Sequence, residues 1–341
     1  MDSSNATRIP LLLESALIES HLHRSLMIIA FTPLAIAIVT GNALVILAIR
    51  REPTLSEPSY LLLACLALAD LLTGLVAIPV EICSRIFLSH ATCTVETAVY
   101  FSIWSYICSW VSFVVIVLVN ADRYVAITRP LRYVSMVTSR RVVLVIVVVW
   151  VIGLTYGFMF AYGASEDQSV SEYCAPEPNR KSSGKVHDLV TSGFIVVFSL
   201  VVIGNNLRIL VIAKSQARRI QMAAPHPPMG VPPPGQKLKQ EVKAIRAILL
   251  LVVIFCLSLF PTCVWFTFNY FFRVSPLAYV LASDVNFFFL NISSAANPFI
   301  YSVHNPLFRK AFRKMFPSFF RWVDGGRVNG ADLEQNSHSL H

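Results

Sequence analysis

The sequence predicts an all-α protein, a bundle of seven membrane-spanning helices followed by a short amphipathic helix. Of its 341 residues, 55% are hydrophobic and only 14% are charged, whereas about 25% of the residues of a soluble domain are charged. The apolar residues form blocks close to the roughly 20 residues that a helix needs to cross a bilayer. A helix satisfies its own backbone hydrogen bonds in lipid and a lone strand cannot, so we interpret the blocks as helices.

The chain is expected to have three parts and no internal repeat. These are an extracellular N-terminus (1–25), a seven-helix transmembrane domain (26–303), and a cytoplasmic amphipathic helix with a tail (304–341). A proline-rich stretch, 225–235, is predicted to form a semi-rigid bend, because proline lacks an amide donor for helix interiors. The expected spans are 26–50, 60–83, 97–123, 142–162, 189–213, 245–268 and 277–303.

The net charge of +9 is distributed in a way that predicts topology and argues against nucleic-acid binding. Basic residues gather after the first, third, fifth and seventh spans, so these segments are expected to face the cytoplasm. The protein is therefore predicted to be a multi-pass plasma-membrane protein with its N-terminus outside. Asn5 begins an Asn-Ala-Thr sequon on the outer side, where glycosylation is expected.

Two motifs stand at the predicted inner ends of spans. Asp122-Arg123-Tyr124 closes the third span, and Asn297-Pro298-Phe299-Ile300-Tyr301 closes the seventh. Other landmarks occur in order and at matching depth, among them Asn42, Asp70, Trp150, Phe255 and Pro261, and Pro130 and Leu131 follow the third span. Across nearly its whole length the chain resembles a rhodopsin-like (class A) G-protein-coupled receptor, with no subgroup assignable.

The resemblance implies how such a receptor would couple to a heterotrimeric G protein. Arg123 would pair with Glu241 at rest, and release of this pair would open a crevice into which Pro130 and Leu131 contact the G protein. Alternatively, Glu241 is one more charge in a solvated basic segment. The residues implied in coupling and activation are Asp122, Arg123, Tyr124, Pro130, Leu131, Glu241, Asn297, Pro298, Tyr301, Phe255 and Pro261.

The resemblance also implies a sodium pocket at mid-membrane, lined by Asp70, Ser112, Ser294 and Asn297. All four carry side-chain oxygens, which suit a hard cation. The alternative is a water-bridged polar cluster without a bound ion. Beyond sodium as an allosteric ion, no cofactor is expected, and the seven cysteines are too scattered for a metal site.

The resemblance implies a disulfide between Cys93 and Cys174, which fall in predicted outer loops. Cys93 precedes Arg123 by 30 residues, more than is usual in the family. Either the third span starts after Cys93, or the bridge differs.

Several family landmarks are replaced. Phe198 stands where the fifth span usually carries proline, Asn206 replaces a deeper tyrosine, and Leu259 replaces the tryptophan that precedes Pro261 by two positions. We therefore expect an unusual balance between resting and active states, with substantial basal activity.

Ser105 occupies the position of the amine-binding aspartate, and Asn291 that of the retinal lysine, so both of those ligand modes are disfavoured. Glu81 and Asp284 remain, with aromatic neighbours that suit a small cationic molecule or short peptide, and a lipid ligand stays open as an alternative. Alternatively, these carboxylates sit in headgroup water or pair with Arg85 or Arg273. The candidate ligand pocket comprises Glu81, Ser105, Tyr106, Ser109, Phe266, Asn269, Asp284, Phe287, Phe288 and Asn291.

No nucleophile elbow, phosphate loop or metal-ligand spacing appears, so an enzyme is not expected. The predicted partners are a heterotrimeric G protein, an extracellular small molecule or peptide, and membrane lipid. A receptor-like protein that acts only by pairing with other receptors is the first alternative, and a transporter is the second.

Overall fold

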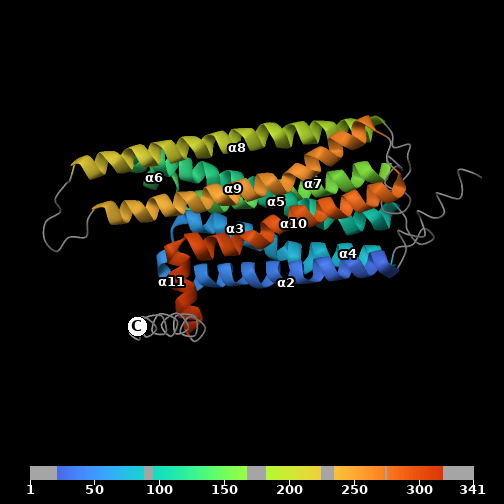
Figure 1. The fold of residues 1–341 in the computed structure, drawn as a ribbon, viewed down its shortest axis with the longest axis horizontal. Helices are drawn as coiled ribbons and strands as arrows, with labels where there is room; N and C mark the ends of the chain where they lie inside the picture. The colour runs from blue at the N-terminus through green and yellow to red at the C-terminus, as the bar shows by residue number, and fades with distance from the viewer. Residues whose placement is uncertain (1–20, 88–94, 167–181, 224–233, 273–274, 318–341) are drawn as a thin grey trace, which may run out of the picture.

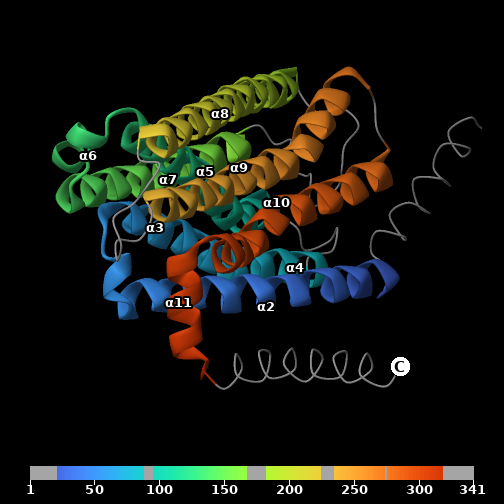
Figure 2. The ribbon, with the colours of Figure 1, turned by 60° about the vertical axis from the view of Figure 1, so that its left-hand side comes forward.

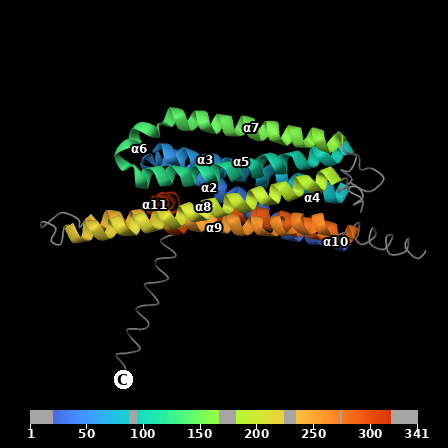
Figure 3. The same ribbon diagram turned by 90° about the horizontal axis from the view of Figure 1, so that it is seen from above.

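The computed structural model describes residues 21–87, 95–166, 182–223, 234–272 and 275–317. These ranges contain helices and no strand. The long helices run side by side along one axis, and α8 and α9 lie against each other over much of their length (Figures 1 and 3).

Each of the seven predicted spans lies within a helical segment. The helices continue past the predicted ends, because polar flanking turns extend them. Five are long and apolar enough to cross a membrane among the described residues, and α9 contains a shorter apolar stretch, Val252–Trp265. The long elements are α2 (His21–Arg51), α3 (Pro58–Leu72), α4 (Ile78–Phe87), α5 (Val95–Thr128), α7 (Ser139–Glu166), α8 (Ser182–Ala223), α9 (Pro234–Phe271) and α10 (Pro276–His304), and the short ones are η1 (Pro53–Leu55), η2 (Thr73–Ala77), α6 (Pro130–Met136) and α11 (Pro306–Met315).

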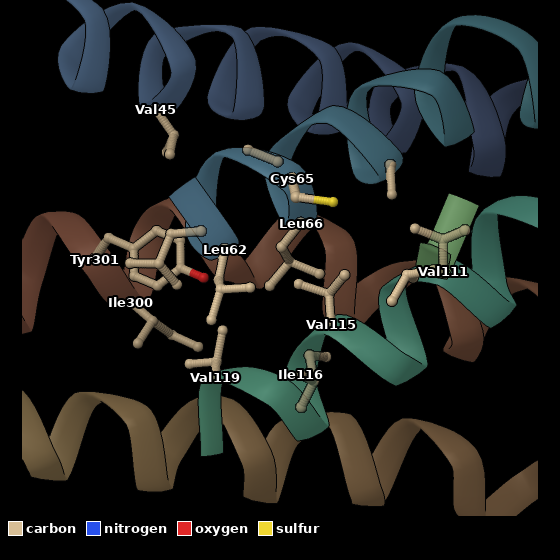
Figure 4. Packing of buried hydrophobic residues seen from close by; sticks show 14 of the residues in the cluster. Val45, Leu62, Cys65, Leu66, Val111, Val115, Ile116, Val119, Ile300 and Tyr301 are labelled. Atoms are coloured by element: carbon tan, nitrogen blue, oxygen red, sulfur yellow. The ribbon is translucent and has the colours of Figure 1, made fainter. Parts of the chain in front are cut away.

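Helix α5 lies at the centre of the bundle, since it contacts α3, α7, α8 and α9, while α2 and α10 close the ring. The main apolar core packs between α3 and α5. Figure 4 shows Leu62 and Leu66 of α3 facing Val115 and Val119 of α5, with Ile300 of α10 beside them.

A π turn, η2, joins α3 to α4 and brings this segment close to α2. Pro79 follows directly and has no amide hydrogen, so the regular bond ladder is interrupted here. At Gly74, an added Cβ would lie 2.8 Å from Val39 Cγ2 of α2. The π turn therefore brings the backbone to a place that only glycine fits.

Two glycines of α7 allow it to pack closely on α5. A Cβ on Gly157 would overlap Ile107 Cγ1, whereas one on Gly204 of α8 would meet nothing within 4 Å. We expect Gly157→Ala to lower the free energy of unfolding by about 1–3 kcal/mol, the usual cost of overpacking. Gly204→Ala should be neutral or slightly stabilising. Thermal unfolding of the two purified variants tests this, and equal melting temperatures would contradict the packing described here.

Helix α9, which contains the sixth predicted span, bends along its outer half (Figure 2), and Pro261 lies inside it. Proline leaves a carbonyl one turn earlier without its helical donor, which explains the bend. Pro234 and Gly235, predicted to belong to the bend before this span, instead form the first turn of α9. Proline is tolerated there because the first amides of a helix have no helical partner. Residues 224–233 of the proline-rich stretch lie outside the described ranges.

The predicted amphipathic helix is confirmed as α11, which crosses the end of α2 at a steep angle (Figure 2). Asn305 caps it, because its Oδ1 accepts hydrogen bonds from Leu307 N at 3.0 Å and Phe308 N at 3.5 Å. Its apolar side chains Phe308, Ala311 and Phe312 are buried, while its basic side chains are exposed.

Candidate functional site

Asp70 is the centre of a buried polar cluster in the middle of the bundle. Its Oδ1 accepts hydrogen bonds from Ser112 Oγ at 3.1 Å and Ser294 Oγ at 2.8 Å. Its Oδ2 accepts one from Asn297 Nδ2 at 2.7 Å. Three helices, α3, α5 and α10, thus place the four residues of the predicted sodium pocket together.

Asn42 of α2 joins this cluster from a fourth helix. Its Nδ2 donates to Ile38 O at 3.0 Å and to Ser294 O at 3.1 Å. One residue earlier, a Cβ on Gly41 would lie 2.8 Å from Pro298 Cγ, so α2 and α10 approach closely at this depth. Asn42 was recognised in the sequence only as a landmark, although an amide inside an apolar span is itself a signal of a partner.

The donor set of the cluster fits a hard cation. The carboxylate oxygens of Asp70 and the hydroxyls of Ser112 and Ser294 are oxygen ligands of the kind that sodium takes. Asn297 presents its amide nitrogen to Asp70 and therefore supplies no oxygen in this arrangement. Asn42 Oδ1 is buried with no hydrogen-bond partner among the described residues, which leaves one acceptor for a polar guest.

At the inner end of the bundle, the end predicted to face the cytoplasm, Asp122 has two partners. Arg123 Nη2 lies 3.0 Å from Asp122 Oδ2, and Tyr133 of α6 donates its hydroxyl to Asp122 Oδ1 at 2.8 Å. Burial, followed by the hydrogen bond to Asp122, raises the pKa of the Tyr133 phenol to about 12. Tyr133 therefore stays a neutral donor at physiological pH and ties α6 to α5.

Helix α6 presents apolar side chains to the surface at this end. Leu131 is 97% exposed and Val134 is 78% exposed, and the neighbouring Tyr124 of α5 is also exposed. Pro130 is the first residue of α6. Glu241 belongs to α9, but its side chain lies outside the description, so its pairing with Arg123 stays a prediction.

Tyr301 connects the mid-membrane cluster with α11. It is buried and its ring stacks on Phe308 with centroids 5.4 Å apart. Phe308 also contacts Tyr60 of α3 edge-on at 6.0 Å. The Tyr301 hydroxyl has no hydrogen-bond partner within the described part of the chain.

Phe198, one of the replaced landmarks, belongs to an aromatic cluster between α5, α8 and α9. Phe113 packs against Phe198 at 4.8 Å and against Phe255 at 5.9 Å between centroids. Leu259, where the family tryptophan would stand, is buried. Ser258 bends back to donate its Oγ to Phe255 O at 2.7 Å, one turn before Pro261.

At the outer end, Glu81 and Asp284 are both buried. Asp284 Oδ2 lies 2.7 Å from His23 Nε2 at the start of α2. His23 could not be predicted as the partner of Asp284, because nothing in the sequence indicates how α2 is turned relative to α10. The side chains of Arg85 and Arg273, the partners considered earlier, lie outside the description.

The other pocket residues are distributed around these carboxylates. Phe287 and Phe288 pack on Phe31 of α2 at 5.4 and 5.6 Å between centroids. Asn291 is buried and donates to Phe287 O at 2.7 Å. Ser105 Oγ is buried without a hydrogen-bond partner among the described residues, while Tyr106 is half-buried and Ser109 is exposed. The side chains of Phe266 and Asn269, and all of Asn5, Cys93 and Cys174, lie outside the description, although α5 does begin after Cys93.

Comparison with known proteins identifies the family. Residues 41–301 match the family described as 7 transmembrane receptor (rhodopsin family). The chain therefore belongs to the rhodopsin family of seven-transmembrane receptors. This confirms the seven-helix bundle and a multi-pass membrane protein, and because the family consists of signalling receptors, the protein is not an enzyme.

Similar proteins include receptors with different names. The adenosine receptor A2a of Canis lupus familiaris is 26% identical over 84% of this chain and 70% of the relative. Trace amine-associated receptor 9 of Rattus norvegicus is 27% identical over 86% of this chain and 88% of the relative. The histamine H2 receptor of Cavia porcellus is 27% identical over 83% of this chain and 77% of the relative.

Proposed function

We propose that this receptor binds an extracellular ligand and activates a heterotrimeric G protein, with its N-terminus outside the plasma membrane. The observation that carries the proposal is the inner end of α5. There Arg123 pairs with Asp122, and Asp122 also accepts a hydrogen bond from Tyr133 of α6, the helix that exposes Leu131. An arginine restrained by a neighbouring acid, next to an exposed apolar helix, suits a surface that a partner engages.

Activation would release Arg123 and move α9 away from α5, opening a crevice at the inner end. Glu241 of α9 is the proposed resting partner of Arg123, and Pro261 supplies the bend about which α9 moves. A ligand shifts this equilibrium only by binding the open form more tightly than the closed one. Phe113, Phe198 and Phe255 lie between the moving helices, so their packing would help to set the basal balance.

The proposed ligand is a small cationic molecule or a short peptide. Glu81, which is buried near the outer end of α4, is the carboxylate we propose as its anchor. Ser105 replaces the usual amine-binding aspartate, so the cation would be held nearer to α4 than to α5. Two of the relatives are named for amines and one for adenosine, which supports a small ligand.

The decisive experiment is ligand-free second-messenger output, both cyclic AMP and inositol phosphate, for wild type beside Arg123→Ala. Signalling by wild type that Arg123→Ala abolishes, at equal surface expression, is the expected result. The opposite result is no signal from the wild type without ligand and no signal when panels of known ligands are tested with a promiscuous G protein. That result refutes coupling, and a receptor-like protein that acts by pairing with other receptors becomes the better account.

Leu131→Ala is expected to reduce G-protein activation about fivefold, the effect of removing an apolar side chain that contributes more than about 1 kcal/mol to an interface. Leu144→Ala is the matched control, because Leu144 is also exposed but lies on the outward face of α7. Nucleotide exchange on a purified G protein measures both. Equal activity of the two variants would show that α6 is not a contact surface.

A further inference from the structure

Helix α6 turns its apolar side chains away from the protein. Leu131 and Val134 lie three residues apart on one side of the helix and are 97% and 78% exposed, and Met136 is exposed as well. None of residues 131–136 is buried. Packing of an apolar face, which stabilises most helices in proteins, therefore contributes little to α6.

The other short helix at the inner end, α11, is fixed in a different way. Phe308 anchors it in the apolar core, and Lys314 Nζ lies 2.7 Å from Glu52 Oε2, just past the end of α2. Helix α6 lies between α5 and α7 (Figure 3) and has seven residues. A helix of that length is unstable on its own, because its nucleation is unfavourable and few residues follow to offset it. Bonds from neighbouring helices are therefore needed to hold α6.

Two side chains form such bonds, one for each neighbouring helix. Tyr133 donates its hydroxyl to Asp122 of α5, as described above. Arg141, in the first turn of α7, donates from Nη1 to Ser135 O at 2.9 Å and to Met136 O at 3.0 Å. The last carbonyls of a helix have no partner within that helix. Arg141 satisfies two of them in α6 and places its positive charge at the negative end of the α6 dipole.

The place of Arg141 in its own helix is unfavourable. A cation in the first turn of a helix stands at the positive end of the helix dipole, and the first turn of α7 contains no acid. Arg140, directly before it, has the same disadvantage, and no hydrogen bond or ion pair within the described part of the chain offsets it. The two arginines therefore differ in what they do for α6 and not in their effect on α7.

We propose that Arg141 is a positioning residue for the surface of α6 that contacts the G protein. By holding the carboxyl end of α6 at the start of α7, it keeps Leu131 and Val134 directed toward the partner without touching the partner itself. This inference rests on the proposed function, in which α6 is a contact surface.

Hydrogen exchange in the purified full-length receptor measures the hold of Arg141 on α6 without any signalling. In Arg141→Ala, the amides of Tyr133 and Val137, which form backbone bonds of α6, should exchange at least about fivefold faster because α6 opens more often. Arg140→Ala is the matched control and should exchange as the wild type does. Arg141→Lys keeps the charge and a donor, so it should restore most of the protection.

Nucleotide exchange on a purified G protein measures the effect on coupling. Arg141→Ala should raise the G-protein concentration that gives half-maximal exchange about fivefold and leave the maximal rate unchanged, because the contact surface is intact but less often in position. In Leu131→Ala, the main contact that Arg141 positions is already lost. The double variant should therefore be little worse than Leu131→Ala alone.

Equal hydrogen exchange in Arg141→Ala and Arg140→Ala would overturn the proposal. Additive losses in the double variant would also overturn it, since they would mean that Arg141 contacts the G protein directly. If the wild type promotes no nucleotide exchange at all, the proposed function fails and the positioning role fails with it. The hydrogen-exchange result would still show whether Arg141 holds α6, so the two failures can be told apart.

Discussion

Asp70→Ala is expected to lower the free energy of unfolding by about 3 kcal/mol or more. The substitution leaves Ser112, Ser294 and Asn297 without the acceptor that each now bonds, and a buried donor left unpaired costs about 1–3 kcal/mol. Because the three donors come from α5 and α10, the loss loosens the contact between these helices and α3. Thermal unfolding of purified receptor measures it.

Asp70→Asn is the matched control, since asparagine retains an acceptor for the two serines and has the same shape. We expect it to cost less than Asp70→Ala. Melting wild type in sodium chloride and in choline chloride tests the proposed ion separately. If sodium chloride raises the melting temperature of wild type and Asp70→Asn abolishes this rise, the result supports a bound ion. Identical melting temperatures in both salts would indicate a polar cluster without a bound ion.

The second large effect is expected for Phe308→Ala, which should cost about 3–5 kcal/mol, as for other phenylalanines removed from a packed core. Phe308 is fully buried and lies between Tyr301 and Tyr60, so its removal leaves a cavity where α11 meets α3 and α10. The loss of Tyr301 packing should also alter basal signalling, which the second-messenger assay detects.

Phe299→Ala is the comparison for this prediction. Phe299 lies on α10 as well, but it is 70% exposed on the outer surface of the bundle. Its removal leaves no internal cavity, and little change in melting temperature is expected. If Phe299→Ala destabilised the receptor as much as Phe308→Ala, burial against Tyr301 would not explain the effect.

The features that could be predicted from the sequence are those that local pattern determines. Apolar length placed all seven spans within helices, and alternating apolar and basic residues predicted the amphipathic helix that follows the seventh span, α11. The Asp70 cluster could be anticipated because each member is a polar residue inside an otherwise apolar span. Such residues need partners, and few are available at that depth.

The features that could not be predicted depend on how helices are rotated and staggered. The pairs His23–Asp284 and Glu52–Lys314 join residues 261 and 262 positions apart, and no local pattern indicates which side chains will face each other over that separation. The π turn before Pro79 could not be predicted either, because a proline indicates that the helix is interrupted but not which kind of turn replaces it. The bond of Tyr133 to Asp122 could not be predicted either, because it follows from the packing of α6 on α5.

The first helix depends on the last part of the chain at three depths. His23 bonds Asp284 at the outer end, Asn42 bonds Ser294 in the middle, and Glu52 bonds Lys314 at the inner end. During synthesis α2 enters the membrane before any of these partners exists, and Asn42 then has only the carbonyl of Ile38 in its own helix. The ring of helices therefore closes last, after the ribosome has produced α10 and α11.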